Sequence, residues 1–388
     1  MNKKLLSIGM ILMVILLSGC STAGSYYKDG KKSFESGDYE KAAESFDKAI
    51  TANPNRAQYY VDYGLALVAL GKYEDAIAEF DHAYMDKDMS IIRENNKRAL
   101  RGKGIAYYHM QDYKKAVKEF KNALKIDELP ELDVDILYYM GSSYRSIGSY
   151  QKAIDAYTEI LAGNKNNAQA YAQRAYCYQC LAMYQEGLAD YDSAISLEPD
   201  NFDYYFGKYN LLIGQGDLNS AKQALQKASD IKAGTEEDKY NLAKLHYYQE
   251  NYDTALSELE SSSQAGIYEA YYYLGEIYRI QKDYTKAVYY YENYIKAGEV
   301  TTPNVYNQIA VCLIKTGDDK KALEYLKTGI AFNDAGTLKV LAKNEIIAYE
   351  GLGDFETAKE KLNEYLESYP EDEAAVREAQ FIDTRLIQ

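Results

Sequence analysis

Few side chains in this sequence could perform catalysis at neutral pH, and they follow no recognisable catalytic pattern. The three histidines, His82, His109 and His246, lie far apart. We find no glycine-rich phosphate loop, no histidine pair at metal-ligand spacing and no identifiable Ser-His-Asp arrangement. Cys177 and Cys180 form a Cys-x-x-Cys pair, but no second pair completes four ligands, so we interpret them as packing residues rather than a redox or metal site. We therefore predict a protein that is not an enzyme and has no metal or other cofactor.

Cys20 has the setting of a covalently modified residue. Lys3 and Lys4 precede an apolar stretch over residues 5–17, which is too short to span a membrane stably. Leu17-Ser18-Gly19-Cys20 then resembles a lipobox, which is cleaved by the lipoprotein signal peptidase after a diacylglyceryl group is added to the Cys sulfur. We predict a lipoprotein signal peptide over 1–19 and a lipidated Cys20 with a short tether over 20–25. The alternative is an ordinary secretory signal beside an unmodified cysteine.

The rest of the chain repeats one short phrase every 32 to 40 residues. The first copy, GDYEKAAESFDKA over 37–49, begins with a Gly-Asp turn and continues with Tyr39, Ala42, Phe46 and Ala49. This spacing places the ring and the small residues on one face of a helix. A fixed period of this size is typical of stacked helical units, so the phrase predicts a solenoid.

These residues resemble the tetratricopeptide repeat, a 34-residue pair of antiparallel helices. The resemblance covers 23–372 and implies an all-α fold, a right-handed superhelical solenoid of about ten helix-turn-helix units with a C-terminal capping helix over 373–388. The frames that we assign are 23–56, 57–90, 97–130, 134–167, 168–201, 202–235, 236–267, 268–301, 303–336 and 339–372. We expect the insertions at 91–96 and 131–133 to lengthen loops beside the third repeat. The capping helix should bury Ala375, Ala379, Ile382 and Leu386 on one face.

In this family the first helix of each unit lines a concave groove in which partners lie. The resemblance therefore implies a set of inward-facing residues: Arg98, Arg101, Tyr108, His109, Tyr138, Arg145, Tyr176, Phe206, Asn210, Tyr240, Lys244, Tyr247, Tyr272 and Arg279. The chain has 43 Tyr and no Trp, and many of the tyrosines occupy the ring positions of the repeats. The surplus favours a groove lined by tyrosine, although some of these rings are also explained by packing between repeats.

The charge of the chain is acidic but uneven. Its net charge of −15 argues against binding to nucleic acid or to anionic lipid headgroups. Repeat three is the exception, with nine Lys and Arg against four Asp and Glu. Arg98 and Arg101, one turn apart on its first helix, are candidates for pairing with an acidic peptide or carboxylate. The alternative is that the basic residues of this repeat form a solvated outer face.

Some members of the family clamp the carboxylate at the end of chaperone tails with a Lys and an Asn on one unit and basic residues two units later. Lys343 lacks the matching Asn, because Ile347 stands at that position, and no repeat follows. We therefore expect that this protein does not bind chaperone tails.

The combined interpretation is a membrane-anchored scaffold or adaptor lipoprotein that binds envelope proteins or peptides through its concave groove. We expect a location on the extracytoplasmic face of the cell membrane, or in the outer membrane if the host has one. Two alternatives remain open. One is a surface lipoprotein that binds glycans through Tyr240, Tyr247 and Tyr272, and the other is an accessory activator of a cell-wall enzyme.

Overall fold

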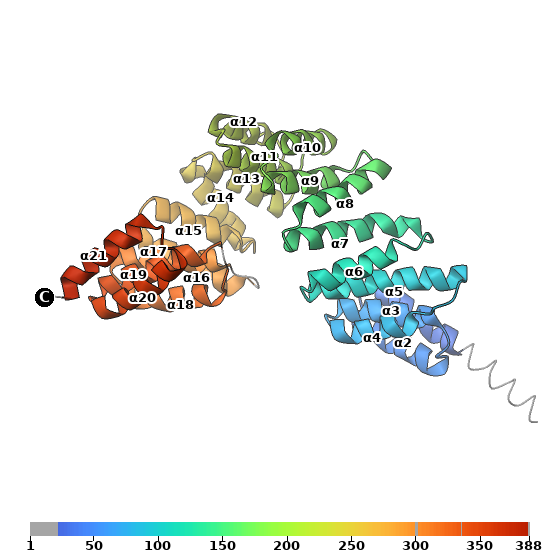
Figure 1. Ribbon diagram of the computed structural model, residues 1–388. Helices are drawn as coiled ribbons and strands as arrows, with labels where there is room; N and C mark the ends of the chain where they lie inside the picture. The colour runs from blue at the N-terminus through green and yellow to red at the C-terminus, as the bar shows by residue number, and fades with distance from the viewer. Residues whose placement is uncertain (1–21, 299–301, 335, 387–388) are drawn as a thin grey trace, which may run out of the picture. The chain divides into compact units, whose positions relative to one another are not determined.

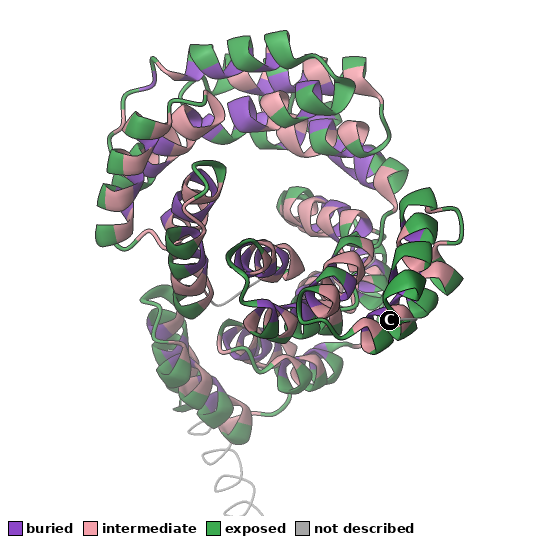
Figure 2. Cartoon of the chain, turned by 90° about the vertical axis from the view of Figure 1, so that its left-hand side faces the viewer, coloured by how far each residue is buried: buried purple, intermediate pink, exposed green. Residues whose placement is uncertain are grey.

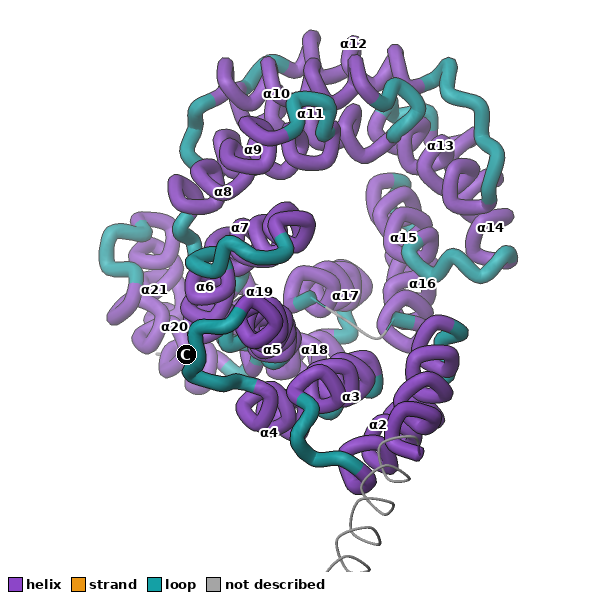
Figure 3. The backbone as a smooth tube through the Cα atoms, turned by 90° about the vertical axis from the view of Figure 1, so that its right-hand side faces the viewer, coloured by secondary structure: helices purple, strands orange, loops and turns teal. Residues whose placement is uncertain are grey.

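The computed structural model describes residues 22–298, 302–334 and 336–386, and every regular element in those ranges is helical. Figure 3 shows these helices joined by loops and turns, so the prediction of an all-α fold is confirmed. No helix in these ranges has both the length and the hydropathy needed to cross a bilayer. The predicted signal peptide (1–19) and Cys20 lie outside the described residues.

The helices succeed one another in pairs that follow the assigned frames, except that the helices over 90–109, 133–146 and 338–351 begin before the frames that start at 97, 134 and 339 (Figure 1). The first helix of repeat one runs over 22–35. The others are α2 (Tyr39–Ala52), α3 (Ala57–Ala69), α4 (Tyr73–Ala83), α5 (Ser90–His109), α6 (Tyr113–Ala123), the 3₁₀ turn η1 (Pro130–Leu132), α7 (Asp133–Ser146), α8 (Tyr150–Gly163), α9 (Ala168–Cys180), α10 (Tyr184–Leu197), α11 (Phe202–Gln215), α12 (Leu218–Ala228), α13 (Glu236–Tyr248), α14 (Tyr252–Gln264), α15 (Ala270–Ile280), α16 (Tyr284–Ala297), α17 (Pro303–Thr316), α18 (Asp319–Ala331), α19 (Leu338–Gly351), α20 (Phe355–Ser368) and α21 (Glu373–Leu386).

The turn inside each pair has a left-handed residue at the same position. Six of the ten repeats place a glycine there, such as Gly37 with a φ of 80°. The other four place a side chain in the same conformation, at Gln111, Ala182, Glu250 and Lys282. A left-handed conformation costs about 1–2 kcal/mol for a residue with a Cβ. The sharp reversal is therefore kept even where the sequence has lost the glycine that favours it.

Helices of a pair approach closely because a ring on the second helix packs on a glycine of the first. A Cβ at Gly104 would lie 2.4 Å from a ring carbon of Phe120, and a Cβ at Gly141 would lie 2.7 Å from the ring of Tyr157. Both rings are fully buried. Phe80 contacts Gly64 of its own repeat and also Gly102 of the next. The same ring thus joins two repeats.

The chain divides into two compact units, Met1–Ala221 and Lys222–Gln388. In the N-terminal unit the first helices of successive repeats contact one another, α3 with α5, α5 with α7 and α9 with α11. In the C-terminal unit the same holds for α13 with α15 and for α17 with α19. Figure 2 shows buried and exposed residues alternating along the helices, as expected for layers that pack on both neighbours.

The expected loop at 91–96 is wrong, because these residues form the first turns of the 20-residue helix α5. The side chain of Asn96 accepts a hydrogen bond from the backbone N–H of Met85 (3.0 Å) and donates one to its carbonyl (2.7 Å). Lys97 is fully buried and pairs with Asp133 (2.7 Å), and it also donates to the carbonyl of Ile126 (2.8 Å). The second insertion, 131–133, ends η1 and starts α7. Lys97, the residue after the first insertion, thus contacts Asp133 of the second insertion.

The last helix, α21, packs on α20 and buries Ala375 and Ile382. Ala379 is partly buried against the same cluster. Leu386, which we expected on the buried face, is 42% exposed. The covering contact is therefore made by the first and middle turns of the helix.

Replacing Gly104 with Ala should lower the stability of the N-terminal unit by about 1–3 kcal/mol, because the new Cβ overlaps the buried ring of Phe120. Urea unfolding followed by far-UV circular dichroism measures the change. Gly163→Ala is the control, since no atom lies within 4 Å of a Cβ at that helical position. A Gly104→Ala protein as stable as the control would show that the close approach is not required.

A second prediction concerns Glu350 of α19, whose Oε1 is buried without a hydrogen-bond partner among the described residues. Burial, and then the neighbouring Glu378 of α21, raise the pKa of Glu350 from 4.5 to about 7. The folded state therefore holds a proton that the unfolded chain releases near pH 4.5, so stability should fall as pH rises from about 4.5 to about 7.

Glu350→Gln should remove this loss and protect α21 at pH 8. Hydrogen exchange of the α21 amides, compared between variant and wild type at pH 5 and at pH 8, measures the effect. Glu367→Gln, at an exposed position of α20, is the control. Equal protection of wild type and Glu350→Gln at both pH values would contradict the prediction.

Candidate functional site

The N-terminal unit contains a polar groove that is lined mainly by the first helices of repeats three to six. It consists of two adjoining cavities of about 330 and about 450 Å³, which share Arg145, Gln169 and Gln173. We call it the Arg145 groove. Its remaining lining residues are Tyr108, Tyr138, Tyr139, Ser142, Ser146, Ala172, Tyr176, Tyr191, Glu198, Asn201, Asp203 and Tyr204.

Helical spacing explains how these side chains meet. Tyr138, Ser142 and Arg145 are separated by four and three residues on α7, so they share one face of that helix. Gln169, Gln173 and Tyr176 repeat the same spacing on α9. The two faces adjoin because α8 returns the chain from the end of α7 to the start of α9. The period of the repeat therefore places the polar side chains of α7 and α9 on one continuous surface.

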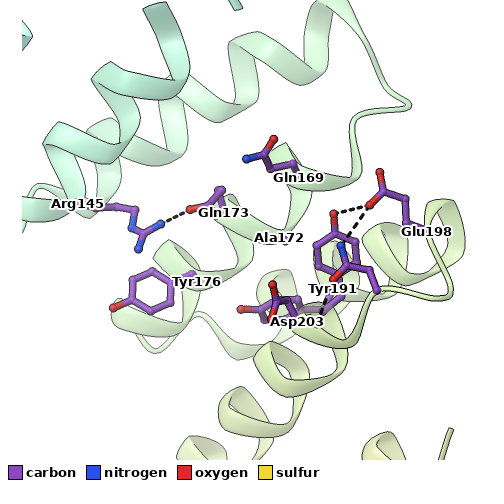
Figure 4. Close-up of a pocket in the computed structure, with 10 residues that line it drawn as sticks. Arg145, Gln169, Ala172, Gln173, Tyr176, Tyr191, Glu198 and Asp203 are labelled. Carbon is purple, nitrogen blue, oxygen red and sulfur yellow. Dashed lines mark hydrogen bonds between the residues drawn. The ribbon is translucent and has the colours of Figure 1, made fainter. Parts of the chain in front are cut away.

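Arg145 lies at the centre of the groove without an acidic neighbour. Its guanidinium stacks on the ring of Tyr176, with the carbon 4.3 Å from the ring centroid, and it donates a hydrogen bond to the Gln173 side chain (Figure 4). Its Nε is buried and has no hydrogen-bond partner within the described chain. No carboxylate of the described residues forms an ion pair with it. Arg145 is thus held in place by neutral groups.

The other end of the larger cavity is acidic. In Figure 4, Arg145 and Glu198 lie at opposite ends, with Gln169 and Gln173 of α9 between them. Glu198 accepts a hydrogen bond from the hydroxyl of Tyr204 (2.8 Å), and burial raises the pKa of that tyrosine. Asp203, in the first turn of α11, is exposed. The cavity therefore has a cationic end, an acidic end and amide side chains between them.

Tyr138 and Tyr108 line the smaller cavity. The hydroxyl of Tyr138 donates to Asn167 Oδ1 (2.6 Å), and the same oxygen accepts from the backbone of Ala170 at the start of α9. Burial raises the pKa of Tyr138 to about 12, so it remains a neutral donor. Tyr108 packs edge-on against Tyr139 with centroids 5.3 Å apart. The structure thus brings four predicted residues together, namely Tyr108, Tyr138, Arg145 and Tyr176.

The predicted arginines of repeat three have carboxylate partners within the chain. Arg98 pairs with Asp62 of α3, and Arg101 pairs with Asp135 of α7 at 2.5 Å. Arg279 on α15 pairs with Glu276 at 2.7 Å. These arginines join neighbouring helices or brace their own helix. Arg98 and Arg101 already pair with carboxylates of the chain, which argues against our expectation that they bind an acidic ligand. The arginine of the groove without such a partner is Arg145.

The predicted tyrosines of the C-terminal unit pack mainly on one another. Tyr240, Tyr247 and Tyr272 each contact the ring of Tyr273, with centroids between 5.1 and 6.2 Å apart. Tyr240 is only 6% exposed. Lys244 lies over the same Tyr273 ring at 5.9 Å. This cluster is a packed aromatic layer, so Tyr240 cannot present a ring face to a sugar.

The other predicted residues lie apart from the groove lining. Phe206 is buried and stacks with Phe202, with ring centroids 6.4 Å apart. Asn210 is exposed on α11. His109 is exposed and stacks on Tyr73 at 5.5 Å. Among the described residues, no group of three or more His, Cys, Asp or Glu is arranged to hold a metal ion.

Sequence reasoning missed several residues that line the groove. Gln169 and Gln173 lie four residues apart on the same helix face as Tyr176, and this spacing could have identified them. Glu198 and Asp203 flank the loop between α10 and α11, and they enter the groove only because α11 packs on α9. No local signal in the sequence indicates that contact.

Models of the tetratricopeptide repeat match 30–90, 97–129, 135–163, 240–299, 303–334 and 346–372, which together exceed half of the chain. The chain is 24% identical over 230 residues to Hsp70-Hsp90 organizing protein 3 of Arabidopsis thaliana, covering 51% of this chain and 40% of that protein. It is 30% identical over 199 residues to Hsp70-Hsp90 organizing protein 1 of Glycine max, covering 44% and 34%. The chain thus spans less than half the length of these relatives.

Among solved structures, a tetratricopeptide repeat protein from Parabacteroides merdae aligns with a TM-score of 0.49 at 18% identity, covering 65% of this chain and 98% of that one. YrrB, described as a TPR protein with an unusual peptide-binding site, aligns with a TM-score of 0.41 at 24% identity, covering 49% and 94%. The repeated matches of the family models agree with the paired helices of the structure. The chain therefore belongs to the tetratricopeptide repeat family, whose helical repeats form scaffolds for protein interaction.

Proposed function

We propose that the protein is a non-enzymatic scaffold that holds extended segments of partner proteins in the Arg145 groove. The observation that carries this proposal is the row of polar side chains along consecutive first helices, in which Gln173 and Gln169 lie between Arg145 and Glu198 while Asp203 also lines the cavity. Side-chain amides can bond both the N–H and the C=O of a peptide backbone. A groove open to solvent suits a polypeptide that enters from the side.

The proposal includes a lipid anchor at Cys20 and partners in the cell envelope. Its support is the sequence alone, namely the charged start, the apolar stretch and the small residues before Cys20. Two or more acyl chains on one cysteine would hold the protein stably on a membrane. The short tether would then keep repeat one close to the bilayer, on the extracytoplasmic face.

The proposed partners are not chaperone tails, although the curated relatives are named as organizing proteins of Hsp70 and Hsp90. Lys343, the lysine closest to a carboxylate-clamp position, is paired with Asp372 at 2.6 Å. The hydroxyl of Tyr365 donates to the same carboxylate at 2.7 Å. Lys343 would have to leave this pair before it could hold the end of a chain.

Photocrosslinking tests the scaffold proposal. A benzoylphenylalanine introduced at Gln169, which is exposed in the groove, should crosslink one or a few defined proteins in the native cell. The same group at Gln151, exposed on the second helix α8, is the matched control. Crosslinks that are absent at Gln169, or equal at both positions, would refute binding in the groove.

Metabolic labelling with an alkyne fatty acid tests the anchor. Cys20→Ser should abolish labelling and move the protein from the membrane fraction to the soluble fraction, because the acylated sulfur is lost. Cys180→Ser, at an exposed cysteine on α9, should retain both the label and the membrane fraction. Lipid labelling of the Cys20→Ser protein would contradict the assignment.

A further inference from the structure

We infer that the segment held in the Arg145 groove carries an acidic side chain that pairs with Arg145 and a basic side chain that faces Asp203. This inference rests on the proposed function and adds the chemistry of the partner. It starts from a contrast among the arginines. The first-helix arginines Arg98, Arg101 and Arg279 pair with Asp62, Asp135 and Glu276. Arg145 instead contacts neutral groups, among them the side-chain oxygen of Gln173 and the ring of Tyr176.

An arginine without a carboxylate is costly where it is partly buried. A buried guanidinium loses hydration, and an acidic partner usually restores the lost free energy. On α9 itself, Arg174 has such a partner, because its Nε and one terminal nitrogen bond both oxygens of Asp190 at 2.7 and 2.8 Å. No carboxylate of the described chain takes this place at Arg145, which lines two cavities. A partner that supplies a carboxylate there would satisfy the charge.

The neighbours of Arg145 orient it for this role. Stacking on Tyr176 fixes the plane of the guanidinium and leaves the donors on its edge available for bonding. Gln173 takes a terminal N–H, and the buried Nε retains a donor without a partner. A carboxylate can accept two parallel hydrogen bonds from such an edge, which favours Asp or Glu over a neutral acceptor.

The acidic end of the larger cavity supplies the second half of the inference. The carboxylate of Asp203 pairs with no cation within the described ranges, and the helix N-terminus beside it favours its negative charge. Glu198 adds a second negative charge, although it is already bonded to Tyr204. A basic side chain at this end would be attracted, while the same side chain beside Arg145 would be repelled.

The size of the cavity also limits how far apart the acidic and basic residues of the partner can be in its sequence. An extended chain advances about 3.3–3.6 Å per residue, so a cavity of about 450 Å³ holds only a few residues. The acidic and basic residues should therefore be near each other in the partner sequence. Gln169 lies between Arg145 and Glu198 and can bond the backbone that connects the partner's two residues (Figure 4).

The test uses the full-length protein in its native cell, with benzoylphenylalanine at Gln169 as the probe. Crosslink yield is measured with wild-type Arg145 and with Arg145→Lys, Arg145→Gln and Arg145→Glu. Mass spectrometry then identifies the captured segment. Arg56→Glu is the matched control, because Arg56 is exposed at the start of α3 and the charge change is the same. Circular dichroism verifies that each variant is folded.

Arg145→Glu should reduce the crosslink yield at least tenfold, and Arg56→Glu should leave it unchanged. Arg145→Lys and Arg145→Gln should give intermediate losses, smaller for Lys, which keeps the charge but not the two-donor edge of the guanidinium. The captured segment should contain Asp or Glu within a few residues of Lys or Arg. Changing that acidic residue to Lys should restore crosslinking to Arg145→Glu. A crosslink yield that is the same in the wild type and in Arg145→Glu would overturn the inference and leave the scaffold proposal standing. A captured segment without an acidic residue would do the same. Absence of crosslinks to the wild type would overturn both.

Discussion

The fold depends on one repeated contact, in which a buried large side chain of the second helix, an aromatic ring in most repeats, packs on a small residue of the first. At Gly30, Gly64, Gly104, Gly141 and Gly275 a Cβ would lie 2.4 to 2.7 Å from the ring carbons of Phe46, Phe80, Phe120, Tyr157 and Tyr291. Ring and glycine therefore set the distance between the helices of a pair. Because Phe80 also contacts Gly102 of the next repeat, the contact sets the spacing of repeats as well.

The spacing of the repeats determines which charged side chains of the first helices are available to a binding partner. When successive first helices approach closely, side chains one repeat apart come within bonding distance. Asp62 reaches Arg98 and Asp135 reaches Arg101 in this way. The charges of the inner surface are thus partly used in joining repeats. A charge is available to a partner only where the neighbouring repeat offers no opposite charge, as at Arg145.

The sequence predicts the paired helices well because ring, small residue and turn recur at one period. It predicts the site less well because groove chemistry depends on pairs across repeats. Arg98 and Asp62 lie 36 residues apart, so their pairing can be predicted only by comparing two successive repeats position by position. The same limit explains the error at 91–96, since nothing local shows that Lys97 will be buried against Asp133. The structure of an irregular insertion depends on contacts with residues that are distant in the sequence.

The contrast between paired and unpaired arginines bears on how a repeat protein acquires specificity. The repeated contact must be similar in every unit, so it cannot by itself distinguish one partner from another. Distinction must come from positions that the packing leaves unconstrained, and these lie on the exposed face of the first helices. A guanidinium fixed by Tyr176 and Gln173 has already lost much of its side-chain freedom before a partner arrives. Less entropy is then lost on binding, and more of the ion-pair energy goes to discrimination between acidic and neutral segments.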